Sequence, residues 1–386
     1  MDLSYIINEL AEDRGDYYNA ISPPIIQTSN FAFNKVSEMR DAFRDEMSGY
    51  LYSRGLNPTV DILRTKLAAL DGAEDALVFN NGAAAVFAGV LANVKSGDHI
   101  VSVHHPYTWA AHLFDKILPR FGVSTTYVDG TRIEAFERAV LPNTSLIYLE
   151  SPNSWHLDIQ DLQAVAELAR AESITTLIDN SYCTPIYQRP IDMGIDIAMQ
   201  TATKYISGHS DTLGGVLSGS ASMMKRIFES EYLCVGSGIQ PFNAWLLLRG
   251  LRTLPMRLEH ISRSTREVLK FLKGHPMVEK TIFPLDEEYP QYDLAVTQMK
   301  GACGLITFYM KAETSLQIES FCERLKHFRM AVSWGGHESL IIPKCASINP
   351  EDFDPGNPDH RMIRMYVGLE DPGYLIRDLA GAFSAY

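Results

Sequence analysis

Short apolar segments rich in valine and isoleucine alternate with longer helical segments from about Asp71 onward. Such alternation is typical of β–α–β units, in which helices cover a mostly parallel sheet. The pattern predicts strands at 76–79, 99–103, 124–128, 145–149 and 175–178. It predicts helices between them, at 83–94, 107–121, 133–140 and 161–171.

The two ends of the chain follow other patterns. The first part, with Pro23-Pro24 and little sustained periodicity, predicts an extended arm that packs on another surface. Beyond Gln240 the sequence predicts a long helix over 242–273, a strand over 304–310 and a last helix over 372–383. We therefore expect an α/β protein with three parts, namely an arm at 1–48, a large domain at 49–240 and a smaller C-terminal α/β domain at 241–386.

Composition and charge exclude several classes of function. The 386 residues are 46% hydrophobic, which is enough for more than one core, and the formal net charge of -13 disfavours nucleic acid and anionic membrane surfaces as partners. No apolar run approaches the ~18 residues of a membrane span. The five cysteines are dispersed and no metal-ligand spacing occurs, so we expect free thiols, a cytoplasmic location and no metal.

Two positions carry the first signs of chemistry. Asp179 directly follows an apolar strand, and ligands of parallel sheets bind beyond the carboxyl ends of the strands. Lys204 lies among small and hydroxylated residues, including Thr201 and Thr203, which is the setting that a Schiff-base lysine needs. Taken alone, an acid such as Asp179 is as typical of a helix cap as of a catalytic site. A lone lysine such as Lys204 is typical of a polar surface loop.

A third candidate is the junction of strand and helix at Asn81-Gly82-Ala83. Glycine there permits close backbone approach, and the free amides of a helix N-terminus attract an anion such as phosphate. The glycine fingerprints of dinucleotide and ATP sites are absent, which disfavours a nicotinamide-dependent dehydrogenase. An acid, a lysine and a phosphate cradle together match pyridoxal 5'-phosphate (PLP), whose ring is an electron sink.

The motifs Ala202-Thr203-Lys204-Tyr205 and Gly208-His209-Ser210-Asp211 resemble those of the fold-type I, aspartate aminotransferase-like PLP enzymes of cysteine and methionine metabolism. The resemblance runs from about Tyr50 to the C-terminus. It implies PLP as cofactor, a large, mostly parallel, seven-stranded sheet and a smaller α/β domain. It also implies a small sulfur amino acid as substrate and a homotetramer, a dimer of dimers with active sites shared between subunits.

The same resemblance implies a role for each candidate residue. Lys204 matches the Schiff-base lysine, Asp179 the carboxylate at the ring nitrogen, and Tyr107 the aromatic side chain that stacks on the ring, so these three are the expected catalytic residues. The further residues expected to bind the cofactor are Gly82, Ala83, Ser154, Thr201, Thr203 and, from a neighbouring subunit, Tyr52 and Arg54. The residues expected to bind substrate are Ser333, Trp334 and Arg364, which matches the arginine that holds the substrate carboxylate.

Three positions favour one subgroup of this family. Trp334 replaces the leucine usual in γ-enzymes, Ser154 replaces their asparagine, and Trp109 occupies the position of the cysteine characteristic of methionine γ-lyases. We therefore expect a carbon–sulfur lyase closest to the cystathionine β-lyases, which convert L-cystathionine to homocysteine, pyruvate and ammonia in methionine biosynthesis. A γ-synthase, a cystathionine γ-lyase or a methionine γ-lyase is the alternative. A PLP fold with a purely regulatory or binding role is disfavoured, because Lys204 and Asp179 are intact.

Overall fold

The computed structural model describes residues 1–384, which form two compact units. The first comprises Met1–Ser151, Ile159–Ser207 and Asp211–Arg252, and the second comprises Pro152–Asp158, Gly208–Ser210 and the described residues from Thr253 onward. Two short segments that interrupt the first unit along the chain thus belong to the second unit. The three-part division at residues 48 and 240 stays a prediction.

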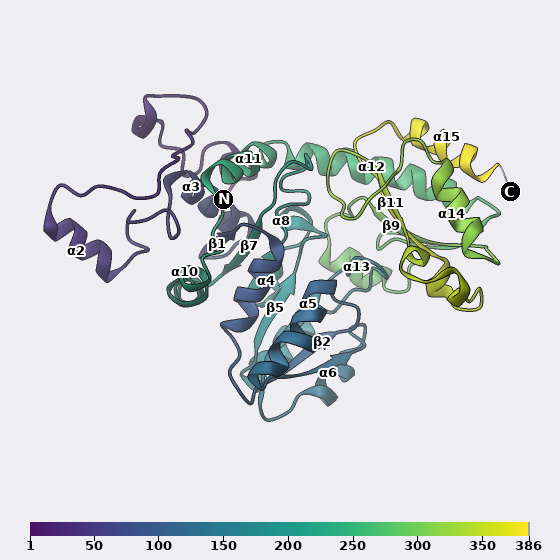
Figure 1. The fold of residues 1–386 in the computed structure, drawn as a ribbon, viewed down its shortest axis with the longest axis horizontal. Coiled ribbons are helices and arrows are strands. Elements are labelled where there is room, and N and C mark those ends of the chain that lie inside the picture. Colours follow the sequence, from purple (N-terminus) through teal and green to yellow (C-terminus); the bar gives the residue numbers. More distant parts are fainter. Residues whose placement is uncertain (385–386) are drawn as a thin grey trace. The chain divides into compact units, whose positions relative to one another are not determined.

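A seven-stranded sheet is the centre of the first unit (Figure 1). In spatial order its strands are β1 (Asp75–Phe79), β7 (Gly215–Gly219), β6 (Ile197–Gln200), β5 (Thr175–Asp179), β4 (Thr144–Glu150), β2 (His99–Val103) and β3 (Ser124–Val128). The five strands from β6 to β3 run parallel to one another, and β7 is antiparallel to both of its neighbours, β6 and β1. The five predicted strands form, and the expected large, mostly parallel sheet is confirmed.

Helices pack on both faces of this sheet because side chains alternate between the faces along each strand. Tyr148 and Leu177 belong to a core shared with α4, whereas Leu149 and Ile178 belong to a core shared with α7. Figure 1 shows α4 and α5 in front of the strands. The helices of this unit are α1 (Leu3–Asn8), α2 (Val36–Arg44), α3 (Pro58–Asp71), α4 (Gly82–Leu91), α5 (Thr108–His112), α6 (Ile133–Ala139), α7 (Leu162–Glu172), α8 (Thr184–Tyr187), α9 (Ala221–Ile227), α10 (Leu233–Val235) and α11 (Pro241–Leu251).

Two local predictions for this unit need correction. The predicted helix over 107–121 is α5 followed by a π-helical segment, Leu113–Ile117, and a 3-10 segment, Leu118–Phe121, in which Pro119 removes an amide donor. The N-terminal arm is not wholly irregular, since α1 and α2 form in it, and Asp2 caps α1 by accepting hydrogen bonds from two backbone amides. Figure 1 shows the arm, in purple, leading away from the sheet.

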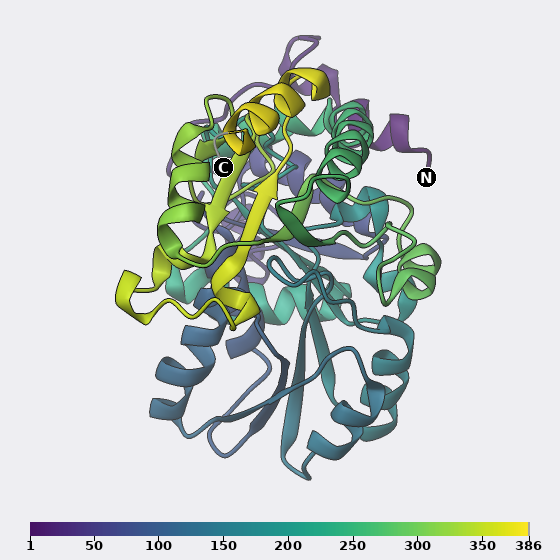
Figure 2. The ribbon, with the colours of Figure 1, turned by 90° about the vertical axis from the view of Figure 1, so that its right-hand side faces the viewer.

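The second unit is built on a five-stranded sheet. Its strands, in spatial order, are β10 (Arg329–Met330), β11 (Leu340–Pro343), β12 (Met362–Tyr366), β9 (Leu305–Met310) and β8 (Val278–Ile282). Its helices are α12 (Leu254–Lys273), α13 (Tyr292–Gln298), α14 (Ser315–Arg324) and α15 (Pro372–Phe383). Figure 2 shows α14 and α15, in green and yellow, beside these strands, which agrees with the smaller α/β domain expected.

The predicted single helix over 242–273 is wrong. The chain forms α11 and α12 instead, with a break at Arg252 and Thr253. Pro255 lies in the first turn of α12, where its missing amide is tolerated, but it cannot continue a helix from the preceding turn. Over the part of the chain described, no helix has both the length and the apolar character that a membrane span needs.

Candidate active site

Acidic side chains end two adjacent strands of the larger sheet. Glu150 of β4 and Asp179 of β5 are partners in the strand register, and both follow by two residues a side chain that faces α4. Asp179 is 6% exposed and accepts a hydrogen bond of 2.9 Å from the Ser181 amide. Burial raises the pKa of Asp179, while the hydrogen bonds from Ser181 and the charge of Lys204 act in the opposite direction. A carboxylate so held suits a protonated ring nitrogen as partner.

Lys204 lies on a tight turn that follows β6. Its amide donates to the Thr201 carbonyl at 3.0 Å, and the Thr203 side chain accepts a hydrogen bond of 3.1 Å from the Gly214 amide. The Thr201 amide in turn donates to the Ser181 hydroxyl at 2.7 Å. The turn that carries the lysine and the loop that carries the acid are therefore joined through Ser181. Sequence analysis missed this serine, whose one signal is its place two residues after Asp179.

The N-terminus of α4 packs against the same turn. The Asn81 side chain caps the helix by accepting a 2.8 Å hydrogen bond from the Ala84 amide. A Cβ atom on Gly82 would lie 2.3 Å from the Thr201 hydroxyl oxygen, and one on Gly215 would lie 2.3 Å from the Asn81 carbonyl oxygen. Both positions therefore require glycine. The arrangement brings the first amides of a helix and a threonine hydroxyl together, which suits a phosphate group.

Tyr107 lies at the start of α5, on the α4 side of the sheet. Its amide donates a 2.5 Å hydrogen bond to the Glu150 carboxylate, and its side chain shares an apolar pocket with Ala83. Burial and the negative charges of Asp179 and Glu150 raise the pKa of the Tyr107 hydroxyl. Glu150 is a further positioning residue that sequence analysis did not single out. The signal for it was the acid at the end of the strand next to that of Asp179.

The segment that carries Tyr52 and Arg54 is fixed at the start of α3. Asn57 caps this helix by accepting a 3.0 Å hydrogen bond from the Thr59 amide, and its side-chain amide donates to the Ser53 hydroxyl at 3.0 Å. Tyr52 and Arg54 are nevertheless exposed, and the guanidinium lies 5.5 Å from the centre of the tyrosine ring. Both side chains are therefore accessible to solvent, although hydrogen bonds hold the segment that carries them in place.

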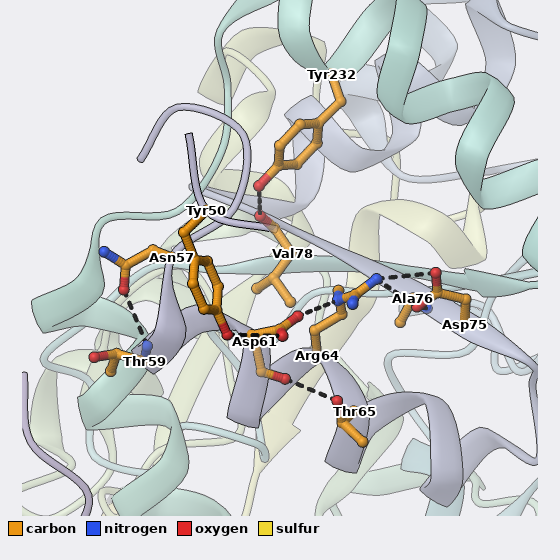
Figure 3. Close-up of polar contacts among 10 residues, drawn as sticks. All are labelled: Tyr50, Asn57, Thr59, Asp61, Arg64, Thr65, Asp75, Ala76, Val78 and Tyr232. Carbon is orange, nitrogen blue, oxygen red and sulfur yellow. Dashed lines mark hydrogen bonds and ion pairs between the residues drawn. The ribbon is translucent and has the colours of Figure 1, made fainter. Parts of the chain in front are cut away.

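Figure 3 shows how the neighbouring part of α3 is held. Arg64 makes a 2.7 Å hydrogen bond to Asp61 and a 2.8 Å hydrogen bond to Asp75 of β1. The Tyr50 hydroxyl donates to Asp61 at 3.2 Å, so the segment before the helix joins the same cluster. The Tyr232 hydroxyl donates to a backbone carbonyl of β1 at 3.0 Å.

The second unit holds the remaining predicted residues. Arg364 of β12 is 8% exposed, and its guanidinium donates a 3.4 Å hydrogen bond to the Ser154 carbonyl. Ser333 has a positive φ of 83° and Trp334 is buried. Their turn is tied to β12, because the Tyr366 hydroxyl donates to a carbonyl at residue 336 at 2.7 Å.

The structure thus forms two groups of predicted site residues. One is in the first unit and comprises Gly82, Ala83, Tyr107, Asp179, Thr201, Thr203 and Lys204. The other group is in the second unit. There, Arg364 donates a hydrogen bond to Ser154, and the turn of Ser333 and Trp334 is hydrogen-bonded to the strand that carries Arg364. The donor set of the first group, an amine, a buried carboxylate, helix amides and a tyrosine, fits PLP.

The chain belongs to the Cys/Met metabolism PLP-dependent enzymes, whose family model matches residues 5–384. The L-methionine gamma-lyase of Treponema denticola is 35% identical over 372 residues, which cover 95% of this chain and 92% of that protein. The chloroplastic cystathionine beta-lyase of Arabidopsis thaliana is 34% identical over 379 residues, which cover 97% of this chain and 79% of that protein.

A solved structure supports the same assignment. The crystal structure of metB from Corynebacterium glutamicum matches with a TM-score of 0.91 and 30% identity, over 100% of this chain and 98% of that one. The expected fold-type I architecture, the PLP cofactor and the membership of this enzyme family are therefore confirmed. Both named relatives are lyases, but they differ in the substrates that their names give.

Proposed function

We propose that the protein is a carbon–sulfur lyase of the cystathionine β-lyase type, which converts L-cystathionine to homocysteine, pyruvate and ammonia. The observation that carries this choice is the buried indole of Trp334, in a turn tied to the strand that bears Arg364. A bulky side chain there, where γ-enzymes carry leucine, shortens the space available to the substrate side chain. Trp109, in place of the cysteine of methionine γ-lyases, points the same way.

Each residue has a defined part in the proposed reaction. When bound, PLP supplies the electron sink for the negative charge that develops at the substrate α-carbon. The Lys204 amine removes the α-proton and then returns a proton to the departing thiolate. The Asp179 carboxylate holds the ring nitrogen protonated, and the forked guanidinium of Arg364 binds the substrate carboxylate. Gly82, Ala83, Thr201 and Thr203 hold the phosphate.

The products formed from L-cystathionine test this proposal. We expect pyruvate and homocysteine from the PLP-loaded protein, and no turnover from Lys204→Ala, which lacks the amine. 2-Oxobutyrate and cysteine would overturn the β-assignment in favour of a γ-lyase. Methanethiol from L-methionine, with no turnover of L-cystathionine, would favour the activity named for the relative from Treponema denticola.

We also propose that the enzyme acts in methionine biosynthesis in the cytoplasm, as a homotetramer whose subunits share active sites. Within residues 1–384, none of the five cysteines forms a disulfide, which suits a reducing compartment. The exposure of Tyr52 and Arg54 on an anchored segment supports a role at the site of a second subunit. Light scattering of the purified protein gives the subunit number, and a monomer would contradict the shared site.

A further inference from the structure

The loop of residues 152–158 is fixed on the sheet of the second unit. The Thr307 hydroxyl of β9 donates to the Trp155 carbonyl at 2.6 Å, and the Tyr289 hydroxyl donates to the Leu157 carbonyl at 2.7 Å. The Asn153 side chain accepts hydrogen bonds from the amides of Trp155 and Leu157, at 3.3 and 3.0 Å. The backbone on both sides of the indole is thus held in place.

The Trp155 ring contacts two cations. The Arg364 guanidinium lies 4.9 Å from the ring centre, and the Lys344 ammonium lies 4.6 Å from the same point. Both distances are within the range of a cation–π contact. Because both are measured to the same ring centre, the two charged groups lie no farther apart than the sum of the two distances. Strand register explains the proximity, because Ile342 of β11 pairs with Arg364 and Lys344 follows two residues later.

Within the described residues of this unit, the Lys344 ammonium has no acidic partner. Among the ion pairs that residues 1–384 form, none includes Lys344, although its side chain is partly buried. Two positive charges on one indole repel each other, so an anion placed near both would be strongly favoured. A single α-carboxylate on Arg364 leaves the ammonium unmatched.

We propose that Lys344 binds a second anionic group, carried on the side chain of the substrate, while Arg364 binds the α-carboxylate. This inference rests on the proposed function, since it takes Arg364 as the carboxylate-binding residue. The substrate class is then an amino acid with a distal carboxylate or an equivalent anion, rather than a thioether with an apolar tail. Trp155 acts as a positioning residue that holds both cations on one rigid ring.

The test compares L-cystathionine, which has two carboxylates, with S-ethyl-L-cysteine, which has a single carboxylate. Both compounds contain a bond between the β-carbon and sulfur. We expect the PLP-loaded protein to prefer L-cystathionine. Lys344→Met keeps the aliphatic stem but removes the charge, so the ratio of the two kcat/KM values should fall by about tenfold, through KM. Lys344→Arg should restore most of the ratio, because it returns the charge.

A matched control is Lys280→Met, which removes an exposed lysine from β8 of the same unit and should leave the ratio as in the unaltered enzyme. An equal loss on both substrates in Lys344→Met would show a structural role and overturn the inference. So would an unaltered enzyme without preference.

A third substrate identifies the source of the anion. A larger loss with O-succinyl-L-homoserine than with L-cystathionine would assign Lys344 to an ester-borne carboxylate. If no substrate is turned over, the proposed function fails, and dissociation constants of the same compounds, from changes in cofactor absorbance, still decide the inference. Equal affinity of the Lys344→Met and unaltered proteins for L-cystathionine would then overturn it.

Discussion

Asp71, at the end of α3, is a fully buried carboxyl group behind the turn that carries Lys204. The Gln200 side-chain amide donates to both of its oxygens, at 2.7 and 2.8 Å, and Gln200 directly precedes Thr201. Burial raises the pKa of Asp71 to about 7, although the Ser218 and Gln200 side chains and the charge of Arg189 oppose the shift. The carboxyl group therefore anchors the strand end that leads into the site, and it changes charge near neutral pH.

Replacement of Asp71 by asparagine should change how stability depends on pH. The folded-state pKa of about 7 is above the model value of 3.8, so the folded protein binds this proton more tightly than the unfolded chain does. That contribution to stability is complete below the unfolded pKa and is lost as the pH rises through the folded one. Between pH 5 and pH 8 the unaltered protein should lose about 2–3 kcal/mol that Asp71→Asn does not lose.

Urea unfolding at pH 5, 6, 7 and 8 measures this difference. Asp293→Asn, at an exposed position in α13, is the matched control and should follow the unaltered protein. Parallel curves for Asp71→Asn and the unaltered protein would show that Asp71 keeps the same proton occupancy when the chain unfolds.

At the scale of single residues, the sequence predicted the chemically reactive residues but not all of the residues that hold them in place. Lys204, Asp179 and Thr201 stand in a recognisable motif and at strand ends, so their clustering could be predicted, and Thr201 and Asp179 do meet through Ser181. Asp71 and Gln200 are 129 residues apart in the chain, and neither lies in a motif. Only the folded sheet brings such a pair together.

At the scale of elements, the junction of β7 and α4 gives the next prediction. A Cβ atom on Gly215 would lie 2.3 Å from the Asn81 carbonyl oxygen and 2.9 Å from the Gly82 Cα atom. Gly215→Ala should therefore push the helix N-terminus away from Thr201 and weaken PLP binding by about tenfold or more, since close packing leaves no room for a methyl group.

Titration of the apoprotein with PLP, followed by cofactor absorbance, gives the affinity. Gly381→Ala is the control, because a Cβ atom there would have no atom within 4 Å apart from the backbone of its own helix. If Gly215→Ala bound PLP as tightly as this control, close packing between β7 and the N-terminus of α4 would not be required for phosphate binding.

Element prediction succeeded where the hydrophobic pattern was regular and failed where proline or glycine interrupted it. The helix α15 forms at the predicted residues 372–383. The helix predicted over 242–273 is instead divided near Pro255. The strands β6 and β7 escaped prediction, because one has only four residues and the other begins and ends with glycine. Short buried strands carry too little alternation to be distinguished from loops.

At the scale of the whole molecule, the N-terminal arm presents an unusual amount of apolar surface. Ile21 is 80% exposed, Val36 74% and Phe43 63%, all within the segment that precedes Tyr52 and Arg54. Large apolar side chains gathered on one segment mark a surface that is covered by a partner. A second copy of the chain is the partner we propose, and the arm would then carry Arg54 to that copy.

Mixing two inactive variants tests this assembly directly. Lys204→Ala lacks the amine of its own site, and Arg54→Ala lacks the guanidinium that we expect it to lend to its neighbour, so each homo-oligomer should be inactive. A pair made of one subunit of each kind has one site with both defects and one with neither. Because half of randomly formed pairs are mixed, about a quarter of the original activity should return after subunit exchange. Inactive mixed oligomers, isolated with two different tags, would mean that Arg54 serves the site of its own chain, and the arm would then be a structural contact alone.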